Sequence, residues 1–193
     1  ASLYGRNQLT GLLEETTDEV FIPVTVGGGI KSRADVKRLL DAGADKVALN
    51  TAALARPQLI DELAGYYGAQ CVVVSVEAKR VPGGWECYTD CGREKTGKDA
   101  VAWAFEAVER GAGEILLTSI DQDGTRRGFD VDLIKAIAPH VAVPVTACGG
   151  AGSLEHIKQA IGEGKADAVA VASVLHYNKI NFEEMRRGLG KAD

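Results

Sequence analysis

The chain contains two copies of one segment, and this repeat constrains the fold more than any other feature. The copies begin with Pro23-Val24-Thr25-Val26-Gly27-Gly28-Gly29-Ile30 and, 121 residues later, with Pro144-Val145-Thr146-Ala147-Cys148-Gly149-Gly150-Ala151. After one extra residue in the second copy, the likeness extends to Thr51 and Ser173. Each copy therefore predicts a strand, a glycine-rich turn, an amphipathic helix and a second strand.

The glycine-rich turns predict two binding sites for anions. Consecutive glycines after a buried strand let backbone N–H groups approach a ligand without obstruction by a Cβ atom, and donors near a helix N-terminus attract negative charge. Two such sites favour an elongated bisphosphate that is held at both ends. The alternative for either copy is a tight turn that binds nothing. The residues are Gly28 and Gly29 in the first copy and Gly149 and Gly150 in the second, with Thr51 and Ser173 expected to close the strands that follow.

Six strands separated by helices are predicted along the chain. The helices include one around Gln8–Glu19 and two that begin after the N-caps Ser32 and Ser153. Strict alternation of strands and helices predicts a parallel α/β sheet. The strands are short runs of Val, Ile and Leu at 21–26, 46–49, 71–76, 114–118, 143–147 and 168–172.

The repeat decides between two α/β architectures. An open doubly wound sheet and a closed (β/α)8 barrel both fit the alternation, but a 121-residue repeat is four βα units, and two such halves close a ring of eight strands. We therefore predict a single domain over residues 1–193, a TIM barrel with a twofold half-barrel repeat. Because a complete barrel needs roughly 250 residues, strand 1, helix 1 and strand 2 are expected to precede Ala1, and the chain to be a fragment of a longer protein.

Composition excludes several functional classes. The net charge of −5 gives no general attraction to nucleic acid, and a hydrophobic share of 46% indicates a globular protein rather than a membrane protein. The four cysteines form no Cys-x-x-Cys pair, which favours reduced thiols in a cytoplasmic protein. No zinc or other metal and no cofactor is expected. His156 is interpreted as a residue of a helix surface.

Polar residues follow most of the predicted strands. In a barrel the reactive groups lie at the carboxyl ends of the strands. Glu77 comes directly after the apolar run 72–76, where burial would raise its pKa toward the range that is useful for proton transfer. The alternative is a structural ion pair of Glu77 with Lys79 or Arg80. The strand-end residues are Asn50, Glu77, Thr118, Asp121, Asp123, Cys148 and Ser173.

The loop after strand 114–118 is polar enough to predict a binding role. We expect Gly124 to donate a backbone N–H to the phosphate held by Gly149 and Gly150, and Asp123 to orient a hydroxyl of the substrate. The alternative is an Asx turn in which Asp121 and Asp123 cap the local backbone. The two roles are compatible.

Several phrases of the sequence match one known family. They lie at 26–30, 43–47, 111–119, 123–125, 148–152 and 172–176, the last reading Ala172-Ser173-Val174-Leu175-His176. On these phrases the sequence resembles, along essentially its whole length, the cyclase subunit of imidazole glycerol phosphate synthase. The isomerase of the preceding step shares the half-barrel repeat and the Gly-Gly turns. It lacks the phrases at 149–152 and 172–176, so the resemblance to it is weaker.

The resemblance implies an ammonia-dependent cyclase and lyase of histidine biosynthesis. Its substrate would be a ribulosyl aminoimidazole carboxamide nucleotide with a phosphate at each end, and its products imidazole glycerol phosphate and an aminoimidazole carboxamide ribonucleotide. Two acids transfer protons in the family. One matches Glu77, where the family usually has Asp, and the other would precede Ala1. The expected substrate and phosphate contacts are Gly28, Gly29, Asn50, Thr51, Thr118, Asp123, Gly124, Cys148, Gly149, Gly150, Ala172 and Ser173.

The same resemblance implies a heterodimer with a glutaminase subunit, which would dock at the amino-terminal face of the barrel and supply ammonia through its core. Asp45 and Lys46 match the docking and gate positions, and Glu114 lies at the same face; ordinary solvated charges are the alternative. Two other functions stay open. One is a paralogous subunit that delivers ammonia for acetamidino-sugar synthesis in surface polysaccharide, which the Glu at position 77 motivates. The other is a non-catalytic scaffold that binds a glutaminase.

Overall fold

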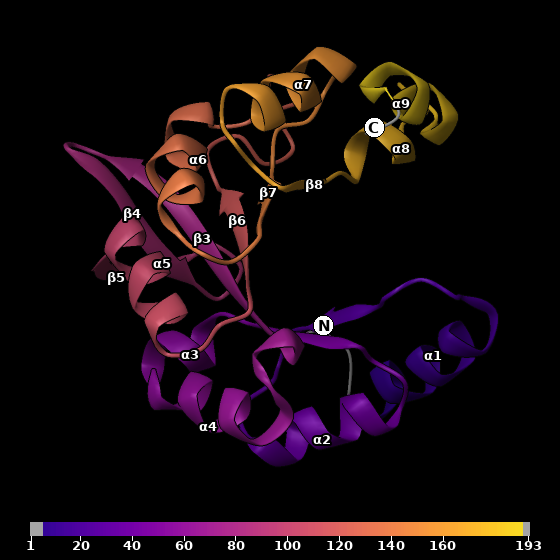
Figure 1. The fold of residues 1–193 in the computed structure, drawn as a ribbon, viewed down its shortest axis with the longest axis vertical. Coiled ribbons are helices and arrows are strands. Elements are labelled where there is room, and N and C mark those ends of the chain that lie inside the picture. Colours follow the sequence, from indigo (N-terminus) through magenta and orange to yellow (C-terminus); the bar gives the residue numbers. More distant parts are fainter. Residues whose placement is uncertain (1–5, 191–193) are drawn as a thin grey trace. The chain divides into compact units, whose positions relative to one another are not determined.

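The structure, a computed structural model, describes residues 6–190 and divides them into two compact units. Unit 1 takes in residues 6–75 and 106–114, and unit 2 takes in residues 76–105 and 115–190. Strands and helices alternate in both units (Figure 1). The chain has an α/β fold with a parallel sheet, the arrangement of part of a (β/α)8 barrel.

Unit 1 contains the first copy of the repeat. Its strands pair in parallel in the order β1-β2-β3, with Val26 opposite Val47 and Ala48 opposite Val73. Val36, Val47, Leu59 and Leu63 are fully buried between helices and strands and form much of its core. The elements are α1 (Arg6–Glu19), β1 (Thr25–Gly27), α2 (Arg33–Asp41), β2 (Lys46–Leu49), α3 (Thr51–Ala55), α4 (Gln58–Tyr67), the 3-10 turn Ala69–Cys71 and the first residues of β3 (Val72–Val81).

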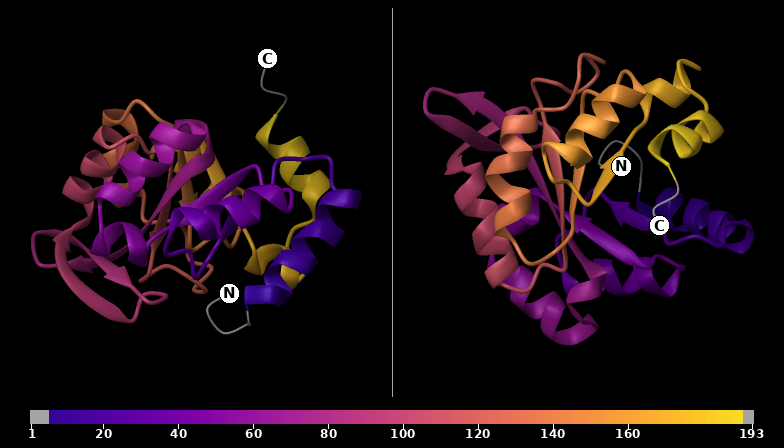
Figure 2. Two further views of the ribbon diagram at one scale, coloured as in Figure 1. Left: turned by 90° about the horizontal axis from the view of Figure 1, so that it is seen from below. Right: turned by 45° about the horizontal axis from the view of Figure 1, so that its top comes forward.

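Unit 2 contains the second copy. Strands β6, β7 and β8 pair in parallel, whereas the end of β3 forms an antiparallel hairpin with β4, which pairs with β5. Both views in Figure 2 show this hairpin projecting from the helices of its unit. The elements are β4 (Gly84–Thr89), β5 (Glu94–Asp99), α5 (Ala100–Glu109), β6 (Glu114–Ser119), α6 (Val131–Ile137), the 3-10 turn Ala138–His140, β7 (Val145–Cys148), α7 (Leu154–Gly162), β8 (Ala168–Ala170), α8 (Ser173–His176) and α9 (Phe182–Leu189). The C-terminal end of α5 and the first residue of β6 belong to unit 1.

All six predicted strands are present. The strand at 46–49 has the predicted bounds, and the others have shifted ends. The first begins at Thr25 rather than at residue 21, because Val24 N–H donates to the Asp45 carboxylate, 2.7 Å away, and Phe21 is 95% exposed. The third strand continues to Val81 instead of ending at residue 76, since it turns into the hairpin. The helix predicted around Gln8–Glu19 is confirmed as α1, while residues 1–5 lie outside the described part of the chain.

The repeat is preserved in the caps of its helices. Ser32 and Ser153, the N-caps of α2 and α7, have almost the same backbone angles, with φ of −150° and −154° and ψ of 163° and 164°. Each side chain accepts a hydrogen bond from the backbone three residues on, at Asp35 and His156. The prediction of both caps is confirmed.

All four cysteines are free. Within residues 6–190, no helix combines the length and the apolar composition that crossing a bilayer requires.

Candidate functional site

Two predicted site residues of unit 2, Thr118 and Cys148, share one face of the sheet. On β6, Ile115, Leu117 and Ser119 are buried, whereas Leu116 and Thr118 on the opposite face are half-buried. Thr118 lies opposite Cys148 of β7, so both side chains share that less buried face. Burial raises the pKa of the Cys148 thiol, and a hydrogen bond with Thr118 partly offsets this effect. Both residues occupy the carboxyl ends of their strands, as predicted.

Glu77 lies within β3 rather than at its end. The strand runs on to Val81, and Glu77 is paired in register with Tyr88 of β4. Its side chain belongs to the half-buried set of β3, between the buried Val76 and Ala78. Ile120 N–H donates to the Ala78 carbonyl oxygen over 2.9 Å, so the loop after β6 begins beside Glu77. This placement brings the predicted catalytic acid next to the predicted substrate loop.

The second glycine turn packs tightly on that loop. Gly128 N–H donates to the Gly150 carbonyl oxygen over 2.8 Å. A Cβ atom on Gly149 would lie 2.8 Å from the Ser119 carbonyl oxygen and 3.4 Å from Asp123, and one on Gly150 would overlap the Gly128 carbonyl oxygen. The predicted proximity of Asp123 to this turn is confirmed. Glycine is required here by packing within the protein as well as by any ligand.

The first glycine turn is different. Gly28 and Gly29 have φ of 104° and 71°, a region that favours glycine, and both are exposed. A Cβ atom on Gly29 would have no atom within 4 Å. The space beside this turn is therefore open to a ligand.

Thr51 and Ser173 do not close strands, contrary to the prediction. Each is the first residue of a short helix, α3 or α8, that follows the second strand of its copy. The N-cap positions are Asn50 and Ala172, and neither side chain caps its helix. The strands end earlier because the chain turns into these helices at equivalent points of both copies. Backbone N–H groups of an uncapped first turn are suited to an anion.

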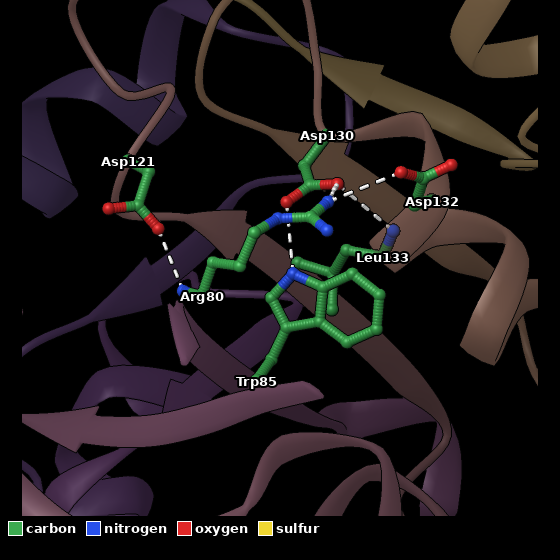
Figure 3. Close-up of polar contacts among 6 residues, drawn as sticks. All are labelled: Arg80, Trp85, Asp121, Asp130, Asp132 and Leu133. Carbon is green, nitrogen blue, oxygen red and sulfur yellow. Dashed lines mark hydrogen bonds and ion pairs between the residues drawn. The ribbon is translucent and has the colours of Figure 1, made fainter. Parts of the chain in front are cut away.

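The loop after β6 is anchored by a cluster that the sequence interpretation missed (Figure 3). Asp121 accepts a hydrogen bond from the Arg80 backbone N–H over 2.7 Å, so the predicted local Asx turn is wrong for Asp121. Asp130, which is buried, accepts from Arg80 Nη2 at 2.8 Å, Trp85 Nε1 at 2.9 Å and Leu133 N at 3.1 Å. The carboxylate thus joins the hairpin to the N-terminus of α6.

The guanidinium of Arg80 completes this cluster. It stacks on the Trp85 ring, 4.8 Å from the ring centre, and also pairs with Asp132 at 3.3 Å. Burial lowers the pKa of Arg80, but Asp130 and Asp132 more than offset that effect and raise it. Arg80 thus pairs with both Asp130 and Asp132. Asp130 could have been found from the sequence as the residue before an apolar helix.

A family model described as histidine biosynthesis protein matches residues 1–181. The chain belongs to this family. It has the fold of the isomerases and cyclases of histidine biosynthesis, and the repeat and its two glycine turns are features of that fold.

The opposite edge of the sheet in this histidine biosynthesis protein carries an ion pair. Lys46 Nζ lies 2.6 Å from Glu114 Oε2, and both residues are the first of their strands, β2 and β6, within unit 1. Both side chains are partly shielded, with exposures of 35% and 19%. The sequence interpretation placed these two residues at one face, and the structure joins them directly.

Asp45 has a structural role that the repeat reveals. Its carboxylate accepts from Val24 N, and the equivalent Asp167 accepts from Val145 N over 2.8 Å. In each copy an aspartate therefore fixes the start of the preceding strand. Docking is not needed to explain Asp45.

No group of three or more potential metal ligands occurs in the described part of this family member.

Proposed function

We propose that the chain belongs to an ammonia-dependent cyclase, which converts a bisphosphorylated ribulosyl aminoimidazole carboxamide to imidazole glycerol phosphate and an aminoimidazole carboxamide ribonucleotide. The proposal refines the family assignment. The observation that carries it is the Lys46–Glu114 ion pair at the amino-terminal edge, 2.6 Å long and partly buried. An isomerase needs no entry for ammonia at that edge, whereas a cyclase supplied by a glutaminase does.

The two glycine turns would hold the two phosphates. The first turn leaves open space at Gly29, and the second lies against the loop that contains Asp123 and Gly124. In each copy a short helix follows the second strand. It begins at Thr51 or Ser173, after the N-cap position Asn50 or Ala172. Thr118 and Cys148, which lie opposite each other on β6 and β7, would contact the part of the substrate beside the second turn.

Glu77 would transfer protons as ammonia adds to the substrate and the adduct breaks and cyclises. The backbone next to Glu77 bonds to the start of the β6–α6 loop through Ala78 and Ile120, and we expect the carboxyl to reach a substrate hydroxyl that Asp123 orients. The family usually places Asp here, and the longer Glu side chain displaces the carboxyl by about 1 Å, so the pocket must compensate.

Substitution of Glu77 tests this role in the full-length protein. Glu77→Gln should reduce ammonia-dependent turnover at least about a hundredfold, because it removes the proton-transferring group, and Glu77→Asp should retain activity. Glu163→Gln is the matched control, since Glu163 is 61% exposed and makes only a 3.8 Å contact with Lys135. Full activity of Glu77→Gln would refute the assignment.

A glutaminase partner, bound at the amino-terminal edge, would deliver the ammonia. Lys46→Ala should lower glutamine-dependent turnover more than turnover with added ammonia, because only the former uses the proposed entry. Equal loss of both activities would contradict the gate assignment.

The acetamidino-sugar function is a second candidate because of the Glu at position 77. Rescue of a histidine auxotroph by the full-length gene supports the cyclase proposal. Failure to rescue, with a soluble and folded protein, favours the paralogous subunit.

A further inference from the structure

We propose that His156 is the positioning residue of the second glycine turn: its imidazole holds the turn and the β6–α6 loop in the arrangement that binds a phosphate. The inference rests on the phosphate-binding role proposed above for that turn. Its evidence comes from a comparison of the two copies of the repeat within the chain.

His156 and Asp35 occupy the same position in the two copies. Each is three residues after a serine N-cap, and the two caps differ by only a few degrees in backbone angles. The Asp35 carboxylate accepts a hydrogen bond from Lys31 N over 3.0 Å. His156 Nδ1 accepts from Gly152 N over 3.2 Å. A side chain at this position therefore fixes the backbone just before the helix in both copies.

The imidazole does more than the carboxylate because it reaches a second segment. A Cβ atom on Gly128 would lie 3.5 Å from His156 Cδ2, so the ring lies on the side of Gly128 where a side chain would stand. Gly128 N–H is the group that donates to Gly150. The ring thus bonds to the segment after the turn and lies beside the loop segment that binds the turn.

No residue larger than glycine fits at position 152 unless the loop shifts. A Cβ atom on Gly152 would overlap the Arg126 carbonyl oxygen of the loop. The loop backbone therefore lies directly against Gly152, the residue whose N–H donates to His156. His156 lies in α7, as the sequence predicted for a residue of a helix surface, and is half-buried there.

Histidine also suits a site for an anion. Nδ1 accepts the Gly152 N–H, and an imidazole that serves as this acceptor brings no negative charge to the turn. A carboxylate in this place, as in the first copy, would add a negative charge beside the phosphate. His156 therefore provides in the second copy the hydrogen-bond acceptor that Asp35 provides in the first, without a negative charge.

Three substitutions of His156 test separately the effect of the hydrogen-bond acceptor, the effect of side-chain charge and the effect on the fold. His156→Leu removes the acceptor at similar size, His156→Asn keeps a neutral acceptor at the reach of Asp35, and His156→Asp keeps the acceptor but adds charge. The control is His140→Leu, at an exposed histidine of unit 2. Inorganic phosphate is titrated into the full-length proteins while backbone amide resonances are followed, and exchange of the Gly128 and Gly152 amides is measured without phosphate.

We expect His156→Leu to weaken phosphate binding at the second turn about fivefold, the effect of one hydrogen bond, and to accelerate exchange at Gly128 and Gly152. His156→Asn should restore the affinity to within about twofold. His156→Asp should restore slow exchange at Gly152 but not the affinity, and His140→Leu should change neither. Unchanged affinity and exchange in His156→Leu, or no recovery in His156→Asn, overturns the inference. If the unaltered protein binds no phosphate, the proposed function fails, and the exchange rates alone decide the positioning role.

Discussion

Removal of the Asp130 carboxylate should destabilise the protein more than any other single change in the Arg80 cluster. The buried carboxylate accepts from three donors, and Asp130→Ala deletes all three bonds. The helix cap at Leu133 N contributes about 1 kcal/mol, and the bond from the half-buried Trp85 indole to a charged acceptor about 1.5 kcal/mol. Arg80 is 52% exposed and keeps Asp132, so its pair adds only about 0.5 kcal/mol.

The expected loss is therefore about 3 kcal/mol in the free energy of unfolding. Equilibrium unfolding in urea, followed by far-UV circular dichroism and by tryptophan fluorescence, measures it. Asp130→Asn keeps a side-chain oxygen for Leu133 N and should lose less than Asp130→Ala.

Asp132→Ala is the matched control, because Asp132 contacts the same guanidinium at 3.3 Å but is 73% exposed. It should cost less than about 0.5 kcal/mol. Equal losses for Asp130→Ala and Asp132→Ala would refute the reasoning, since burial and the additional donors at Asp130 would then carry no weight.

The other structural predictions concern glycine and cysteine residues. Gly150→Ala should lower the free energy of unfolding by about 3 kcal/mol or more, because the new Cβ would overlap the loop backbone. Gly29→Ala should lower it by only about 1 kcal/mol, because Gly29 has a positive φ but open space around it. Similar urea midpoints for both variants would count against this contrast. Burial raises the pKa of the Cys87 thiol to about 12, so a thiol reagent at about pH 8 should label the exposed Cys91 and reach Cys87 only after unfolding. The free energy of unfolding should also fall as the pH rises from 9.0 toward about 12, because the unfolded chain releases the Cys87 proton first; prompt labelling of Cys87 in the folded protein would contradict both expectations.

Much of the site was predictable because its elements repeat. The glycine turns, the serine caps and the position of Asp123 beside the second turn follow from local patterns and from the order of parallel strands, and the structure confirms them. The strand-closing role of Thr51 and Ser173 was wrong because apolar runs do not reveal where a strand yields to a short helix. The roles of Glu77 as an acid and of a glutaminase partner stay predictions.

The sequence by itself determined the order of the six strands with helices between them, the serine caps of α2 and α7, and the family to which the chain belongs, whereas the short helices α3 and α8 were not predicted. These features depend on the periodicity of apolar residues, on the positions of glycine and on hydrogen bonds between residues close in the sequence. All three can be recognised in a short stretch of sequence. Only the tertiary structure decided which distant groups meet. Arg80 finds Asp130 fifty residues away, and His156 joins Gly152 to the loop at Gly128, because strand pairing and helix packing bring together segments whose contact no local pattern encodes.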